Sequence, residues 1–163
     1  MTNKKLTDIE SKRKFKLDDL LRVQREQAEK PKPPVDVEVL LGDSVVTVRI
    51  PHLPPAEFDK LADRHSPHLA YRDQLGCWFL LEPLTRDHPE IVLLSGGEED
   101  DLFVLRGGSR NKEAFYRWSE VYDALGHEDR QSVQAAIWGL YVHEPSKRLV
   151  AAKARAVKED SGE

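Results

Sequence analysis

The chain contains little of what builds a disulfide, a membrane span or a cysteine-based metal site. Cys77 is the single cysteine among 163 residues, which excludes an intrachain disulfide and a site with several cysteine ligands. Because Trp78 and Phe79 follow it, we expect Cys77 to pack as a small apolar residue. No apolar run approaches the roughly 20 residues that a membrane helix needs, and the first residues lack the apolar segment of a secretory signal. We therefore expect a cytoplasmic protein without a membrane partner.

Motifs for nucleophilic catalysis and phosphate binding are also missing. Neither Gly96-Gly97 nor Gly107-Gly108 precedes the Lys-Ser/Thr pair or the helix entry that a phosphate-binding loop needs. There is no Gly-x-Ser-x-Gly turn to present a nucleophile. We therefore expect a non-enzymatic protein with no catalytic residue and no cofactor.

Two groups of residues resemble metal ligands only superficially. Pro67 stands between His65 and His68 and breaks the helical spacing that would align two imidazole ligands. The acidic run 98–101 lacks the alternating oxygen ligands and the central glycine of a calcium loop, so a solvated loop tip is favoured. We expect no metal site.

Charge is distributed unevenly along the chain. Residues 1–34 hold ten Lys/Arg and six Asp/Glu, a net charge of +4, whereas residues 35–145 hold ten and twenty, a net charge of -10. An acidic body argues against nucleic acid as the main partner, because Lys and Arg contacts to phosphate supply most of that affinity. A basic arm remains suited to an acidic protein surface.

The stretch from Val35 to Ile50 predicts a β-hairpin. If Gly42-Asp43 forms a two-residue turn, the valines of both arms oppose one another on one face, and Asp36 opposes Arg49 on the other. Prolines flank both ends of this stretch, where a residue without an N–H ends a strand ladder. The hairpin needs a cover for its apolar face before it is stable in water.

Residues 1–34 predict a basic helix followed by a proline-rich spacer. Leu17, Leu20 and Leu21 form a partial apolar stripe, and Pro31–Pro34 is a stiff, extended segment. Such a helix is marginal alone and becomes firm when it is docked. It is either a frayed arm or a partner-binding helix.

Apolar residues at helical spacing predict a helical body after the hairpin. Pro55 and Glu57 fit a helix start, and two short apolar runs, Ile91–Leu94 and Leu102–Leu105, suggest a second hairpin around the acidic loop. The tail 146–163 is either flexible or helical. We expect one α+β domain, mainly α-helical, over 35–145, with helices at about 55–65, 67–82, 111–125 and 128–143.

Two aromatic residues of the last predicted helix are candidate contacts for a partner. Trp138 is next to the inward-facing Ile137, so partial exposure is expected, and a partly exposed Trp is a suitable anchor. A simple packing role is the alternative. With Tyr141 and the three leucines of the arm, the candidate partner-binding residues are Leu17, Leu20, Leu21, Trp138 and Tyr141.

The order of these elements resembles a known family. The sequence is similar to the tail assembly chaperones of long-tailed bacteriophages, particularly those infecting actinobacteria. The similar segments are a charged helix with Lys16–Leu21, a proline-containing spacer, the hairpin, the helix start Pro54–Leu61 and the two closing segments Trp118–Leu125 and Ala135–Leu140. The resemblance covers most of residues 15–142 and is weakest over 86–110.

The resemblance implies a non-enzymatic protein that binds the tape measure protein and keeps it soluble while the tail tube polymerises. It implies action in the host cytoplasm and absence from the mature virion. The tail tube protein and further copies of the chain are additional candidate partners. The rival hypothesis is a virion structural protein, such as a head-to-tail connector or a tail terminator subunit. A small regulatory protein that binds nucleic acid through the basic arm is the third alternative.

Overall fold

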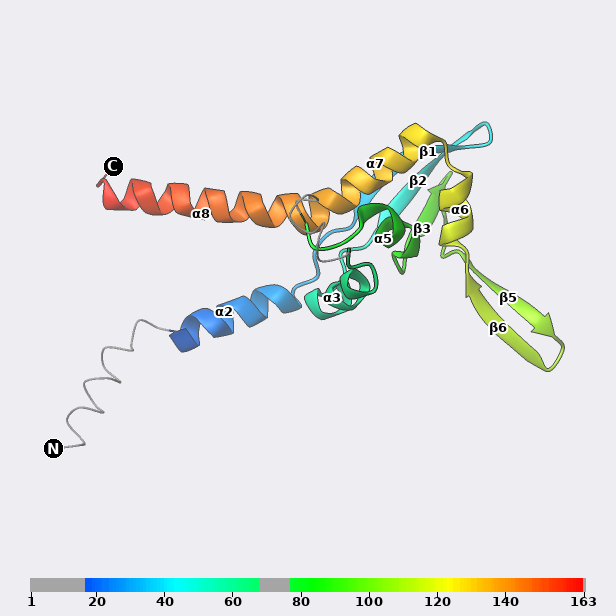
Figure 1. Ribbon diagram of the computed structural model, residues 1–163, viewed down its shortest axis with the longest axis horizontal. Coiled ribbons are helices and arrows are strands. Elements are labelled where there is room, and N and C mark those ends of the chain that lie inside the picture. The colour runs from blue at the N-terminus through cyan, green and yellow to red at the C-terminus, as the bar shows by residue number, and fades with distance from the viewer. Residues whose placement is uncertain (1–16, 68–76, 163) are drawn as a thin grey trace. The chain divides into compact units, whose positions relative to one another are not determined.

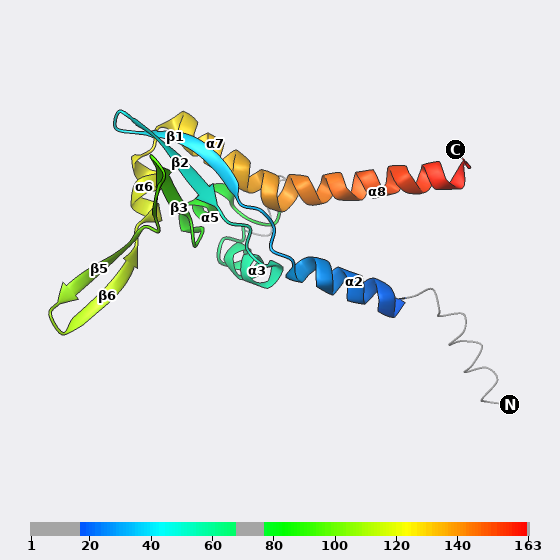
Figure 2. The same cartoon turned by 180° about the vertical axis from the view of Figure 1, so that it is seen from behind.

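A computed structural model describes residues 17–67 and 77–162. The chain divides into two units, residues 1–32 and residues 33–163, so the division falls within the proline-rich spacer. The described part of the first unit is helix α2 (Leu17–Glu29), and the second unit has a mixed α+β fold (Figures 1 and 2).

A four-stranded antiparallel sheet lies at the centre of the second unit. Its order follows the sequence: β1 (Val35–Leu41), β2 (Ser44–Ile50), β3 (Val92–Ser95) and β4 (Glu98–Asp100). β1 and β4 are therefore the two edge strands, and they lie at opposite sides of the sheet.

The first two strands confirm the predicted hairpin and its register. Val35 pairs with Ile50 and Val39 pairs with Val46, and Gly42 takes the positive φ of 59° that the two-residue turn needs. The valines of this face, together with Ile50, pack into the core. On the other face Arg49 forms a two-bonded ion pair with Asp36, with the first bond 2.9 Å long.

The predicted second hairpin is wrong in its pairing. Both apolar runs contribute to strands, but β3 pairs with β2 and β4, whereas β5 (Phe103–Gly108) pairs with β6 (Asn111–Tyr116) in a separate two-stranded sheet. Gly96 and Gly97 both have positive φ, so the chain turns directly after Ser95. The acidic run therefore returns as strand β4 instead of forming a loop tip.

In the second unit three helices pack together, and one of them contacts the sheet. α5 packs against α6 and α7, and α7 packs against β1. A π-helical turn, η2, joins α7 directly to α8. The helical segments are α3 (Pro55–Arg64), α5 (Leu81–Asp87), α6 (Trp118–Ala124), α7 (His127–Trp138), η2 (Gly139–His143) and α8 (Glu144–Asp160).

The start of α3 agrees with its prediction, but the next predicted helix, 67–82, does not hold at its end. Residues 68–76 lie outside the described residues, 77–80 are not helical, and α5 begins at Leu81. Pro83 falls in the first turn of α5, where its missing N–H has no intrahelical partner to lose. Pro83 therefore helps to start a helix here, whereas the predicted helix 67–82 ended just before it.

The two closing helices also differ from their predicted bounds. The helix expected over 111–125 begins only at Trp118, because residues 111–116 pair with β5 as a strand. The helix expected over 128–143 does not stop before Pro145 but continues as α8. η2 ends at His143, two residues before this proline, and such a widened turn accommodates a missing backbone donor.

Apolar side chains of the sheet and the helices form one core. Trp118 and Tyr122 of α6 are its largest fully buried side chains, followed by Phe79. Phe58 of α3 stacks on Tyr141 with ring centroids 3.8 Å apart. The core thus joins the hairpin that the sequence predicts to the last helical segments of the chain.

Candidate partner-binding surfaces

Helix α2 carries an apolar stripe of exposed leucines. Leu17, Leu20 and Leu21 are 54%, 57% and 42% exposed, and none of the 13 residues of the helix is buried. The spacing i, i+3, i+4 puts the three leucines on one side of the helix. The structure therefore brings these three predicted residues together as one exposed surface.

Charged residues of α2 lie away from its leucines. Arg22 contacts Asp19 at 3.8 Å and Glu26 at 3.4 Å. Pairs at these spacings support the helix by only a few tenths of a kcal/mol each. Because a short helix gains most of its stability from packing an apolar face, α2 is suited to become firmly helical against an apolar partner.

The two candidate aromatic residues of the second unit lie in different environments. Trp138 at the end of α7 is half-buried, so part of its ring is accessible to a partner. Tyr141 is only 7% exposed and packs within the core. Its ring stacks on Phe58 and its hydroxyl bonds internally, so the structure gives Tyr141 a structural role and leaves Trp138 as the accessible residue.

A buried polar network surrounds the Tyr141 hydroxyl. Its oxygen accepts a hydrogen bond from the Leu53 N–H at 3.0 Å and lies 2.9 Å from His88 Nε2. His88 Nδ1 lies 2.9 Å from the Pro89 carbonyl oxygen and must donate to it, because a carbonyl only accepts. Nε2 of the neutral imidazole is then the acceptor of the Tyr141 hydroxyl.

Burial shifts the pKa values of this network. Loss of solvation lowers the pKa of His88 from 6.5 to about 4 and raises the pKa of Tyr141 to about 12. Burial also raises the pKa of Tyr116, which donates to the His88 carbonyl oxygen at 2.9 Å. All three groups are therefore neutral near pH 7.

His88 has a strongly lowered pKa, and such a shift makes the network a candidate catalytic site. No buried side-chain nitrogen or oxygen in residues 17–67 and 77–162 lacks a hydrogen-bond partner. The bonds join the end of β2, the α5–β3 connection and η2. The arrangement thus ties segments distant in sequence together.

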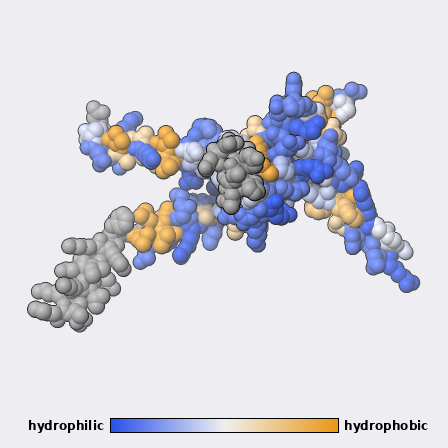
Figure 3. Space-filling view, in the orientation of Figure 1, coloured by the Kyte–Doolittle hydropathy of each residue, from blue (hydrophilic) through white to orange (hydrophobic). Residues whose placement is uncertain are grey.

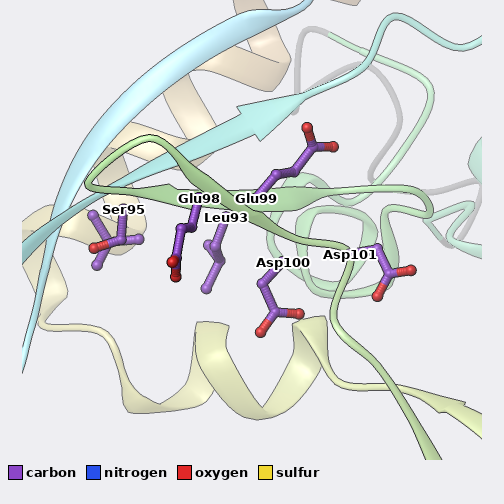
Figure 4. Close-up of a pocket in the computed structure, with 7 residues that line it drawn as sticks. Leu93, Ser95, Glu98, Glu99, Asp100 and Asp101 are labelled. Atoms are coloured by element: carbon purple, nitrogen blue, oxygen red, sulfur yellow. The ribbon is translucent and has the colours of Figure 1, made fainter.

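An acidic groove of about 700 Å³ lies beside strands β3 and β4. Figure 4 shows Leu93, Glu98 and Asp100 on the side of these strands that faces α6, whereas Glu99 points to the opposite side. Val46 and Leu93 supply apolar surface to the groove, and carboxylates supply its charge. The groove residues are Val46, Leu93, Ser95, Glu98, Glu99, Asp100 and Asp101.

The sequence pattern did not reveal this groove, because the position of the acidic run depends on the turn at Gly96-Gly97. Once the run is a strand, period-two alternation puts Glu98 and Asp100 on the same side as Leu93. No set of three or more His, Cys, Asp or Glu residues in the described part of the chain is arranged to hold a metal ion.

Two further exposed apolar surfaces were not predicted. Figure 3 shows them along α8 and on the β5–β6 hairpin. Phe103 and Leu105 alternate on β5, and Leu149, Val150 and Val157 lie on α8. Their alternating or helical spacing is visible in the sequence, but exposure follows only from which elements remain uncovered.

Comparisons with protein-family models, curated proteins and solved structures find no match to this chain. Within the described residues, no helix combines the length and apolar character needed to cross a membrane.

Proposed function

We propose that this chain is a non-enzymatic tail assembly chaperone of a long-tailed bacteriophage. It binds apolar helices of the tape measure protein and keeps that protein soluble in the host cytoplasm while the tail tube assembles. The observation that carries the proposal is the exposed leucine stripe of α2, on a helix with no buried residue. The resemblance of the sequence to this family over most of residues 15–142 supports it.

The α2 stripe has the chemistry of a helix-in-groove contact. An amphipathic helix binds another apolar surface through residues at i, i+3 and i+4, the spacing of Leu17, Leu20 and Leu21. Trp138, half-buried on α7, is a second contact residue in the proposal. The contacts need no catalytic group, metal or cofactor.

The size of the stripe suits a reversible contact. Fully burying an exposed leucine contributes about 1.5–3 kcal/mol, and these three leucines are about half-exposed. Covering them contributes about 1 kcal/mol each, or about 3 kcal/mol together before ordering costs. One such contact is weak, so repeated contacts along a long client would hold it while allowing the tail tube protein to displace the chaperone.

Co-expression with the tape measure protein of the same phage tests the proposal. We expect the client to become soluble and to co-purify with this chain. Replacing Leu17, Leu20 and Leu21 together by glutamine should return most of the client to the insoluble fraction, since the helix-forming tendency is kept and the apolar stripe is lost.

The matched control replaces Arg22 and Glu26, which pair on the charged part of α2, by glutamine. This variant should keep the client soluble. A client that stays insoluble with the wild-type chain would overturn the chaperone proposal. If both variants lowered client solubility equally, the leucine stripe would not be the contact surface. An insoluble client together with a ring of defined mass formed by this chain alone would favour the connector or terminator alternative.

A further inference from the structure

Helix α8 is an exposed helix whose own fold leaves its apolar residues uncovered. None of its 17 residues is buried, and Leu149, Val150 and Val157 are 57%, 66% and 68% exposed. Helices in water are held mainly by packing of an apolar face, and continuity with α7 through η2 supports only the first turn directly. α8 therefore has an unpartnered face.

This face is both apolar and basic. Val150, Lys153, Ala154, Val157 and Lys158 follow the spacing i, i+3, i+4, i+7 and i+8, so they share one side of the helix. α8 as a whole carries five Lys/Arg and three Asp/Glu, in a chain whose centre is acidic. Its partner should offer apolar surface between carboxylates.

The acidic groove has this complementary chemistry. Val46 and Leu93 would meet the valines, while Glu98, Asp100 and Asp101 would meet the lysines. Lys153 and Lys158 are five residues apart, which is about 7.5 Å along a helix. Glu98 and Asp100 are two residues apart, which is about 6.7 Å along a strand, so the two charged rows have similar spacing.

The α8 of the same chain is directed away from this groove. α7 packs against β1, and β4 lies at the opposite edge of the sheet. α8 continues α7 and extends beyond the sheet (Figures 1 and 2). A second copy of the chain is thus the source of an α8 that fits the charge and the apolar surface of the groove.

We propose that α8 of one copy docks into the acidic groove of a second copy. The two surfaces are different, so the contact is head-to-tail and generates rings or chains of copies. The α8 residues and the groove residues are different residues from the α2 leucines proposed to bind the client.

Sedimentation over roughly 1–100 µM protein tests the proposal in the full-length chain. We expect the average mass to rise above the 18.6 kDa of one chain as concentration increases. Raising the salt from about 0.05 M to about 0.5 M should shift the association to higher concentration, since screening weakens contacts between charged groups. A wild-type chain that stays monomeric throughout this range would overturn the proposal.

Charge-reversal variants locate the interface. The groove variant Glu98→Lys and the helix variant Lys153→Glu/Lys158→Glu should each raise the dissociation constant at least about tenfold, because like charges would then meet. Both sets of side chains are exposed, so folding is expected to be kept, as checked by thermal melting. The control variants Asp59→Lys and Lys60→Glu on exposed positions of α3 should associate like the wild type.

A mixture of the two variants provides the sharpest outcome. The groove variant keeps a basic α8, and the helix variant keeps an acidic groove, so one productive contact remains between them. We expect the mixture to associate at lower concentration than either variant alone, through a dimer that joins one chain of each variant. At the opposite ends of that dimer the lysine introduced in the groove would face the glutamates introduced in α8, so larger species would support the same interface. Association of either variant at wild-type strength, or a mixture that stays monomeric, would overturn the assignment of these two surfaces.

Discussion

The buried imidazole of His88 makes the stability of the second unit depend on pH below neutrality. His88 is fully buried, and its ring bonds to the Pro89 carbonyl oxygen and the Tyr141 hydroxyl. Burial lowers its pKa from 6.5 to about 4. Lowering the pH from about 7.5 to about 5 is therefore the perturbation that should expose its contribution.

The sign and size follow from the protons bound by each state. Well above pH 6.5 both states are neutral at this position and the full stability is present. As the pH falls, the unfolded chain binds a proton that the folded chain excludes, and stability is lost until the pH passes the folded pKa of about 4. The complete loss is about 3.4 kcal/mol, of which about 2 kcal/mol is reached at pH 5.

Urea unfolding followed by tryptophan fluorescence measures this loss, because the buried Trp118 reports on the core. The variant His88→Gln should be less stable at neutral pH but should show a much smaller pH slope between about pH 6.5 and 5. His127→Gln, at an exposed position, is the control and should keep the wild-type slope.

Carboxylates add a separate loss at lower pH. Hydrogen bonds from arginine lower the pKa values of Asp36, Glu120 and Asp123, so their contribution is present above the unfolded values and is lost as the pH falls through the folded ones. That range lies below the interval from pH 6.5 to 5 over which His88 is measured. Unfolding free energies that stay constant from pH 6.5 to 5 in the wild type, or an unchanged slope in His88→Gln, would refute the reasoning.

Three further predictions follow from burial, backbone conformation and domain division. Val48→Ala, at a position with no exposed surface, should lower the free energy of unfolding by about 2 kcal/mol, whereas Val45→Ala, at an exposed position, should change it by less than about 0.5 kcal/mol in the same urea titration. Gly107→Ala should speed amide exchange in β5 and β6, because Gly107 has a φ of +133° and a Cβ there would clash with the Asn111 carbonyl oxygen. Gly108→Ala is the control and should leave the exchange unchanged, because a Cβ at Gly108 meets no atom. Equal exchange rates in the two variants would contradict the strain argument. Deleting residues 1–32 should leave the melting of the second unit cooperative, since these residues form a separate unit, and a loss of cooperativity in differential scanning calorimetry would show that they belong to its core.

The hairpin was predictable because its signals are local. Alternating valines, one turn with Gly42 and flanking prolines all favour the same register, and no distant residue competes with it. The start of α3 is predictable for the same reason, since Pro55 and Glu57 act within one turn.

The segment from Ile91 to Leu125 was not predictable in the same way. Phe115, Trp118 and Tyr122 fit helical spacing, yet residues 111–116 pair with β5 as a strand. β3 pairs with β2, which lies more than forty residues earlier in the chain. Tertiary pairing overrides local periodicity here, and the acidic groove that results was hidden from the sequence for this reason.

Local spacing also identifies some of the candidate contact residues, whereas tertiary packing decides the others. The leucines of α2 form a stripe whatever surrounds them, so spacing alone finds them. Trp138 and Tyr141 are three residues apart on neighbouring helical turns, and only the packing of Phe58 and His88 decides that Tyr141 is internal.

The π-helical turn at Gly139–His143 also sets the rotational phase of the helix that follows it. A π turn holds one residue more than an α turn, and each residue advances an α-helix by about 100°. Deleting a single residue such as Gly139 would therefore allow a regular helix from α7 into α8 and rotate every side chain of α8 by about 100° about the helix axis. The direction in which the valines and lysines of α8 point is thus fixed by one inserted residue far from them in sequence.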